Sequence, residues 1–299
     1  MSIRDKSAAP YLALISVQAL FGSLPVIGKV VLAVIPAFGL VGIRVGVSTL
    51  ILFLVQLYRR RVWLKVKSDY WRLAVLSLFG ITFNQLLFIT GLSLTKAANT
   101  SLLAITIPIF ALTIGSLIGS ERLGRIKVVG IALAAAGVIL LIDPRNASFS
   151  SQTTKGDLLI IANSISYGIY VATSKSVIQR NGAVRSMMWI FIFAALVCLP
   201  LGAWSFRTVE ISTIEPTIWQ MVLYISIVAT ALPYLLNAWA LARVDPSTVA
   251  VFVYLQPLIG FLLAVIFLGE HVDFLFVLSS LMIFGGVYLV TRKFVPNEI

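Results

Sequence analysis

Two long stretches of this chain, residues 91–142 and 240–291, carry the same pattern of residues 149 positions apart. Each stretch holds two apolar runs separated by a short turn with charged residues. Three pairs of residues recur at this spacing: Pro108 and Pro257, Glu121 and Glu270, and Gly137 and Gly286. Earlier in the two halves, 146 positions apart, Phe21, Gly22 and Lys29 correspond to Tyr167, Gly168 and Lys175. A fixed long period indicates a fold built from repeated units. We therefore divide the chain into two similar halves, 1–143 and 157–299, joined by a linker, 144–156.

The composition restricts these halves to one class of protein. Hydrophobic residues make up 60% of the chain and charged residues 11%, whereas soluble domains are nearer half apolar and a quarter charged. The apolar runs do not alternate with polar residues, as the strands of a membrane β-barrel would. The chain is therefore predicted to be an all-α integral membrane protein.

The chain has room for ten membrane-spanning helices of about 20 residues each. We expect these spans at 10–28, 37–57, 71–91, 97–119, 126–143, 157–178, 186–206, 218–241, 247–268 and 273–291. Five spans in each half is an odd number, so the second half starts on the opposite side of the membrane from the first. The sequence thus predicts two inverted five-helix repeats, a plan common among secondary transporters.

The basic residues orient this arrangement. With a cytoplasmic N-terminus, 17 of the 23 Lys and Arg residues fall in cytoplasmic segments and only 4 in outer loops. Because cytoplasmic loops carry the excess of Lys and Arg, both termini are expected in the cytoplasm and the protein in the cytoplasmic membrane. The net charge of +12 then faces anionic lipid headgroups, and we expect no nucleic-acid partner.

The repeated unit resembles the drug/metabolite transporter superfamily, EamA type. The residues that carry the resemblance are Pro108 to Glu121 with Gly130 and Gly137, and Pro257 to Glu270 with Gly285 and Gly286. The first copy ends in Gly119-Ser120-Glu121 and the second in Leu268-Gly269-Glu270, so the glycine is shifted by one position. The resemblance implies a ten-helix fold and the export of amino acids or other small metabolites.

Three prolines fall inside expected spans. Pro108, Pro233 and Pro257 each remove a backbone donor, which frees the carbonyl groups of Ala104, Ala229 and Val253. In lipid such a carbonyl needs a partner or a water-lined cavity. The prolines either form gating kinks beside a substrate path or are packing kinks satisfied by neighbouring helices.

Polar side chains at membrane depth mark a candidate substrate site. They must face protein or water, so they either line a cavity or form hydrogen bonds between helices. We predict that the following residues bind substrate: Gln18, Asn84, Asn163, Tyr167, Tyr170, Tyr234, Asn237, Tyr254 and Gln256. Amides that donate and accept, beside flat phenol rings, suit amino acids or aromatic compounds.

Charged residues inside or beside spans are few. Arg44 lies about two turns inside the second span, where it either contacts the carboxylate of a substrate or extends to the outer headgroups. Glu121, Asp157 and Glu270 lie near span ends, where we expect solvation. With no acidic or histidine relay at depth, we expect facilitated transport that depends weakly on pH; the alternative is proton transfer through an edge acid such as Glu270.

Small residues in spans five and ten, such as Gly130, Gly137 and Gly286, permit close helix packing, either within one chain or between two. The protein is accordingly expected to be a monomer or a homodimer. We predict a secondary transporter that exports small metabolites by alternating access, with no enzymatic activity, no metal and no cofactor. The alternative is a membrane scaffold or receptor that moves no solute.

Overall fold

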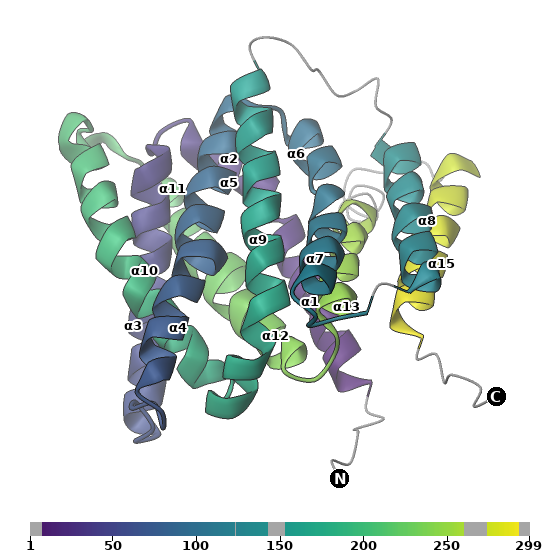
Figure 1. The fold of residues 1–299 in the computed structure, drawn as a ribbon. Helices are drawn as coiled ribbons and strands as arrows, with labels where there is room; N and C mark the ends of the chain where they lie inside the picture. The colour runs from purple at the N-terminus through teal and green to yellow at the C-terminus, as the bar shows by residue number, and fades with distance from the viewer. Residues whose placement is uncertain (1–7, 123, 143–152, 260–273, 293–299) are drawn as a thin grey trace.

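The structure, a computed structural model, describes residues 8–122, 124–142, 153–259 and 274–292. In this part of the chain every regular element is helical (Figure 1), which confirms the predicted all-helical class there. The second part of span nine, Glu270 and most of the linker 144–156 lie outside the described residues.

Several of the long helical stretches in the first half are interrupted and so consist of more than one element. Its elements are α1 (Ala9–Gly22), α2 (Leu24–Leu32), α3 (Ala37–Tyr58), α4 (Ser68–Ser77), the π-helix η1 (Leu78–Thr82), α5 (Phe83–Leu94), α6 (Ala97–Leu103), α7 (Thr106–Leu117) and α8 (Arg125–Ile142).

The second half is divided in the same way. Its described elements are α9 (Thr154–Asn181), α10 (Ala183–Ser205), the 3₁₀ turns η3 (Phe206–Thr208) and η4 (Ile211–Thr213), α11 (Pro216–Ser226), the π-helix η5 (Ile227–Ala231), α12 (Leu232–Leu241), α13 (Pro246–Val251), the 3₁₀ turn η6 (Phe252–Tyr254) and α15 (Phe274–Thr291).

Eight helical stretches of the described chain are long and apolar enough to cross a membrane. They are Ala9–Leu32, Ala37–Tyr58, Ser68–Leu94, Asn99–Leu117, Arg125–Ile142, Ala183–Ser205, Pro216–Leu241 and Phe274–Thr291, and a shorter apolar helix covers Pro246–Ile259. The more polar α9 has 28 residues, which at 1.5 Å per residue is roughly 42 Å, and it runs through the middle of the bundle (Figure 1).

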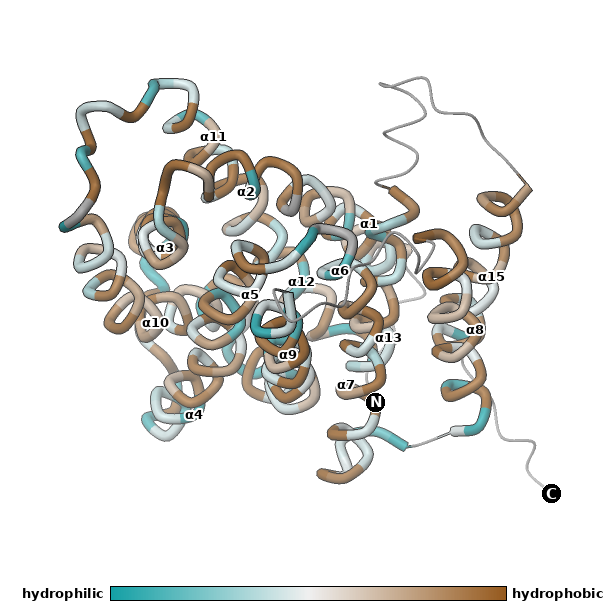
Figure 2. Tube along the Cα trace, turned by 90° about the horizontal axis from the view of Figure 1, so that it is seen from above, coloured by the Kyte–Doolittle hydropathy of each residue, from teal (hydrophilic) through white to brown (hydrophobic). Residues whose placement is uncertain are grey.

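Two tightly packed helix pairs form the sides of the bundle. Viewed along the bundle, α3 and α10 lie together on one side and α8 and α15 on the other, with α9 and α12 between them (Figure 2). A Cβ atom on Gly130 would lie 2.8 Å from the carbonyl oxygen of Gly286, and one on Gly137 would lie 2.9 Å from that of Ser279. The small residues of spans five and ten therefore pack within one chain, where their lack of side chains lets the two backbones touch.

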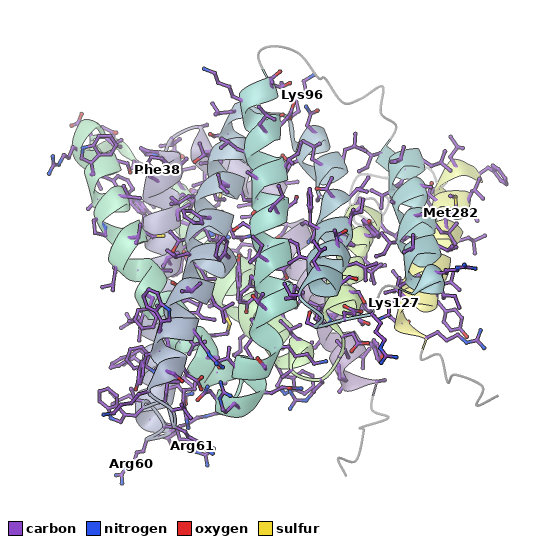
Figure 3. All side chains as sticks on the ribbon, viewed as in Figure 1. Phe38, Arg60, Arg61, Lys96, Lys127 and Met282 are labelled. Atoms are coloured by element: carbon purple, nitrogen blue, oxygen red, sulfur yellow. The ribbon has the colours of Figure 1, made fainter. Side chains whose placement is uncertain are left out.

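Basic residues gather at one end of the bundle. Arg60 and Arg61 lie at the opposite end from Lys96, and Lys127 lies at the end of α8 that faces the same way as theirs (Figure 3). The start of α1 and the end of α15 are on this basic side as well (Figure 1). The structure thus places both ends of the described chain on the side where basic residues are most frequent.

Two acids predicted to be solvated are buried instead. Glu121 is 9% exposed and accepts hydrogen bonds from the backbone N–H and the hydroxyl of Ser247. Asp157 is 6% exposed and accepts hydrogen bonds from Thr95 at 2.6 Å and Asn99 at 3.0 Å. The expectation of solvation was wrong for these two residues because each carboxylate meets donors from another helix that are remote in sequence.

Candidate functional site

A cavity of about 90 Å³ lies between the two halves of the chain. Since one water needs roughly 10–15 Å³, the cavity has room for several water molecules. Helices of both halves contribute polar lining residues: Gln18, Arg44, Asn84, Gln85, Thr100, Ser101, Asn163, Tyr167, Tyr234 and Gln256. Apolar residues complete the wall: Phe21, Leu24, Phe88, Ala104, Ile107, Ile160 and Val253.

The cavity lies toward the end of the bundle that carries Lys96. Three lining residues, Phe88, Thr100 and Ile160, are within two turns of the helix ends on that side, where α5 ends and α6 and α9 begin. These three residues extend the cavity toward the Lys96 end of the bundle.

Four side chains from three helices form the polar centre of the site. The amide of Asn84 in α5 donates to Asn163 Oδ1 in α9 at 2.7 Å. Asn84 Oδ1 accepts from the hydroxyl of Tyr234 in α12 at 2.6 Å, and that hydroxyl accepts from Gln85 Nε2 at 3.0 Å. Each group keeps further hydrogen-bonding capacity, so this network supplies both donors and acceptors to the cavity wall.

A second amide pair connects two residues that are far apart in the sequence. Gln256 Nε2 donates to Gln18 Oε1 at 2.8 Å, which links the helical turn after η6 to α1. Beside this pair the ring of Phe21 meets that of Tyr234 edge to face, with centroids 5.5 Å apart. Both amides and aromatic rings thus contribute to the cavity wall.

Arg44 of α3 is fully enclosed and does not extend to the membrane surface. It is 1% exposed, and its Nε donates to Thr230 Oγ1 at 2.8 Å. Its Nη2 lies 3.5 Å from the carbonyl oxygen of Ala229, the group that Pro233 frees in span eight. Of the two alternatives for Arg44, the structure therefore contradicts contact with the outer headgroups, and Arg44 borders the cavity.

Six of the nine residues predicted to bind substrate line the cavity: Gln18, Asn84, Asn163, Tyr167, Tyr234 and Gln256. The other three lie behind them. Tyr170 donates to the sulfur of Met187 at 3.4 Å, Asn237 donates to the hydroxyl of Tyr167, and Tyr254 donates to the carbonyl oxygen of Ile105 at 2.8 Å. Asn237 therefore supports a lining residue, whereas the partners of Tyr170 and Tyr254 do not line the cavity.

The three prolines follow interruptions in regular α-helix. Pro108 comes after the break between α6 and α7, Pro233 after η5, and Pro257 after η6. The backbone N–H of Ile107 donates to the carbonyl oxygen of Ala104 at 3.0 Å, so this freed group has a local partner. Pro257 borders a smaller hollow beside Tyr254.

A charged cluster joins the two halves on the basic side of the bundle. Glu121, which follows α7, pairs with Lys127 of α8 and accepts both hydrogen bonds from Ser247 of α13. Lys127 Nζ and Lys175 Nζ each lie 3.5 Å from a carboxylate oxygen of Asp245. We call these five residues the basic-side cluster; they hold α7 and α8 against α9 and the start of α13.

The site contains residues that are not among the nine predicted to bind substrate. Gln85 and Thr230 contact Tyr234 and Arg44, respectively, and Phe21 and Phe88 form apolar wall. An amide in an apolar run was a sufficient signal for Gln85. Nothing in the local sequence distinguishes Phe88 from the other apolar residues around it.

Comparison with known proteins identifies the family. The EamA-like transporter family matches the chain twice, over residues 8–143 and 154–292. An uncharacterized transporter of Archaeoglobus fulgidus is 30% identical over 227 residues, which cover 76% of this chain and 78% of the relative. A probable amino-acid metabolite efflux pump of Salmonella typhimurium is 29% identical over 189 residues, covering 60% of this chain and 62% of the relative.

The fold also has a counterpart among solved structures. A crystal structure with 18% sequence identity superposes with a TM-score of 0.77 and covers 96% of this chain and 97% of its own. At this identity the likeness concerns the fold alone.

Proposed function

This chain belongs to the EamA-like transporter family of membrane proteins, and we propose that it is a secondary transporter that exports small metabolites across the cytoplasmic membrane by alternating access. The observation that carries the proposal is a polar, partly aromatic cavity between two halves that the same family matches. In secondary transporters built from inverted repeats, substrate binds where the repeats meet, near the membrane midplane.

The contacts between α8 and α15 support the inverted repeat. Gly130 meets Gly286, and Gly137 meets Ser279. At the spacing of 149 residues, Gly137 corresponds to Gly286 and Gly130 to Ser279, so each contact is the counterpart of the other. Reciprocal contacts of this kind are typical of a two-fold relation. Since the two helices run antiparallel, the axis is perpendicular to them and lies in the membrane plane.

Other features support the same axis. The π-helices η1 and η5 begin 149 residues apart, at Leu78 and Ile227. Two hydrogen bonds join residues that are each other's counterparts at this spacing: Gln85 with Tyr234, and Ile105 with Tyr254. Counterparts touch only near an axis, so both bonds support an axis next to the cavity.

The proposed substrates are amino acids or aromatic compounds. The amides of Asn84, Asn163 and Gln256 offer donors and acceptors for polar groups, and the rings of Phe21 and Tyr167 offer flat apolar area. Amino-acid metabolites are also what the Salmonella typhimurium relative is described as exporting.

The proposed orientation has both termini and the basic-side cluster in the cytoplasm. The cavity then faces outward in this conformation, and the cluster closes the cytoplasmic side. Inward opening requires Glu121 and Ser247 to separate. The domain boundaries that accompany this proposal are 1–143, 144–156 and 157–299.

Flux through the purified protein in proteoliposomes tests the proposal. Vesicles loaded with a panel of labelled amino acids and aromatic acids should release at least one solute faster than protein-free vesicles, with saturable kinetics. A scaffold or receptor would release every solute at the protein-free rate, and that result across the panel would contradict a transport function.

A further inference from the structure

Arg44 is the one charged side chain that lines the cavity in the described part of the chain. It lies in α3 and is 1% exposed. A guanidinium stays protonated in proteins, so the cavity wall carries a fixed positive charge. The lining residues include no described carboxylate that would offset this charge.

The partners of Arg44 are neutral. The hydroxyl of Thr230 accepts from Nε at 2.8 Å, and the carbonyl oxygen of Ala229 lies 3.5 Å from Nη2. Nη1 has no hydrogen-bond partner among the described residues, and none of their acidic side chains pairs with this guanidinium.

A buried charge without a counter-charge is unfavourable, and deep ionisable groups in membrane proteins are usually paired or functional. The planar guanidinium matches a carboxylate through two parallel hydrogen bonds. A carboxylate that enters the cavity would give Nη1 an acceptor and compensate the charge. An amine would instead add a second positive charge beside the first.

We propose that Arg44 binds the carboxylate of the transported solute, so that the cavity takes small monocarboxylates and amino acids and rejects organic cations. The proposal rests on the proposed transport function and names the substrate class of that site. Phe21, Leu24 and Phe88 line the cavity and would contact the apolar part of the solute. The neutral amides would accept the ammonium group of an amino acid.

A purely structural role for Arg44 is the competing explanation, because its hydrogen bond to Thr230 joins α3 to η5. Such a role would affect all solutes equally. Discrimination between an acid and the amine of the same shape is a readout that a structural role does not change.

The experiment measures binding to the purified protein in lipid nanodiscs with two matched probe series. One series is leucine, 4-methylpentanoate and 3-methylbutylamine; the other is phenylalanine, 3-phenylpropanoate and 2-phenylethylamine. In the wild type, the acids and amino acids of at least one series should bind saturably, and the amine of that series should bind at least about tenfold more weakly.

Two variants then locate the discrimination. Arg44→Gln should weaken binding of the carboxylate probes at least about tenfold, and Arg44→Lys, which keeps the charge without the planar fork, should give an intermediate loss. Arg207→Gln, which removes an exposed charge in η3, should leave all affinities unchanged. If Arg44→Gln does not fold, the inference is tested by the ratio of acid affinity to amine affinity, measured in the wild type and in the Arg44→Lys variant.

Three results would each overturn the inference. Amines could bind as tightly as the acids, carboxylates could bind to the Arg44→Gln variant as tightly as to the wild type, or carboxylates could show no saturable binding. Flux of the same probes separates it from the proposed function. Binding that depends on Arg44 without flux supports this inference and contradicts transport. Flux that depends neither on the carboxylate of the solute nor on Arg44 supports transport and contradicts this inference.

Discussion

Tyr234 connects several other side chains of the candidate site. Its hydroxyl donates to Asn84 and accepts from Gln85, while its ring meets those of Phe21 and Phe191 edge to face, at centroid distances of 5.5 and 5.6 Å. The three hydrogen-bonding residues come from both halves of the chain. A change at this one hydroxyl should therefore affect the site without changing the packing of the ring.

Tyr234→Phe removes that hydroxyl and leaves the buried amides of Asn84 and Gln85 with fewer partners. We expect a loss of about 1–3 kcal/mol in the free energy of unfolding, together with weaker apparent affinity for the solute. Thermal unfolding in detergent and concentration-dependent flux measure the two effects. Tyr224→Phe is the matched control, because its hydroxyl, 3.2 Å from Ser23, is at an exposed site. Equal behaviour of the two variants would contradict the assigned network.

Asn237 holds Tyr167, a cavity residue, from behind by donating to its hydroxyl. Asn237→Ala should leave folded protein in the membrane and reduce apparent affinity roughly tenfold, as expected for one well-placed hydrogen bond. Tyr167→Ala should impair transport in the same assay. Gln220→Ala, at an exposed position of α11, serves as control. Normal flux in both site variants would mean that this face of α9 does not bind the solute.

The sequence showed which polar residues lie within the expected spans, but it did not show which way their side chains point. Tyr167 and Tyr170 are three positions apart on one helix and both fit a single polar face, yet Tyr167 lines the cavity and Tyr170 packs toward Met187. The burial of Glu121 depends on Ser247, 126 residues away. Local spacing contains no information about partners at that distance.

The close packing of α8 against α15 depends on glycines, which have no side chain, at the points of contact. A Cβ on Gly286 would meet the Ala134 Cβ at 2.6 Å and the Ala134 backbone nitrogen at 2.7 Å. A Cβ on the adjacent Gly285 would meet only the side chain of Leu133, at 3.6 Å, which is ordinary packing. Gly286 and the adjacent Gly285 therefore serve as a test position and its matched control.

Gly286→Ala should destabilise the protein by about 1–3 kcal/mol, because backbone atoms of α8 must move. Gly285→Ala should be neutral or slightly stabilising, since alanine favours a helix by about 1 kcal/mol over glycine. Thermal unfolding of the two variants in the same detergent compares them directly. A similar loss in both would show that α8 and α15 do not approach as closely as described.

The interruptions of the helices were predictable only in part. Proline chemistry indicated breaks near Pro108, Pro233 and Pro257, and each follows a departure from regular α-helix. The π-helix η1 has no proline, so no local signal announced it. Its counterpart η5 comes just before Pro233, and the repeat spacing of 149 residues, applied to that proline, would have pointed to 78–82.

At the scale of the molecule, the repeat was the feature that the sequence carried best. Pro108 and Pro257, and Gly137 and Gly286, indicated two halves, and the family model matches the chain twice, over residues 8–143 and 154–292. The contacts that join the two halves on the basic side could not be read in this way. The basic-side cluster joins Glu121 and Lys127 to Asp245 and Lys175, and none of these pairings follows from the repeat spacing.

The charge of the cavity leads to a prediction about coupling. Its described lining includes no carboxylate and no histidine, the groups that usually relay protons at membrane depth. Solute flux should therefore persist when the proton gradient is dissipated at a fixed solute gradient and membrane potential. Flux that collapses under these conditions would contradict uncoupled transport and favour a proton-carrying acid at a span edge, such as Glu270.

Alternating access is the central claim, and a reversible lock on the basic-side cluster tests it most directly. The variant is Glu121→Cys with Ser247→Cys in a Cys198→Ala background, which removes the native cysteine. Single-cysteine variants, treated with the same short bifunctional thiol reagent, are the controls. The measurement is solute flux in proteoliposomes before cross-linking, after it and after reduction.

If the two residues separate in each cycle, flux should be lost on cross-linking and return on reduction, while both single-cysteine variants keep their flux throughout. Undiminished flux through fully cross-linked protein would contradict the account, because the solute would then cross without the opening that alternating access requires.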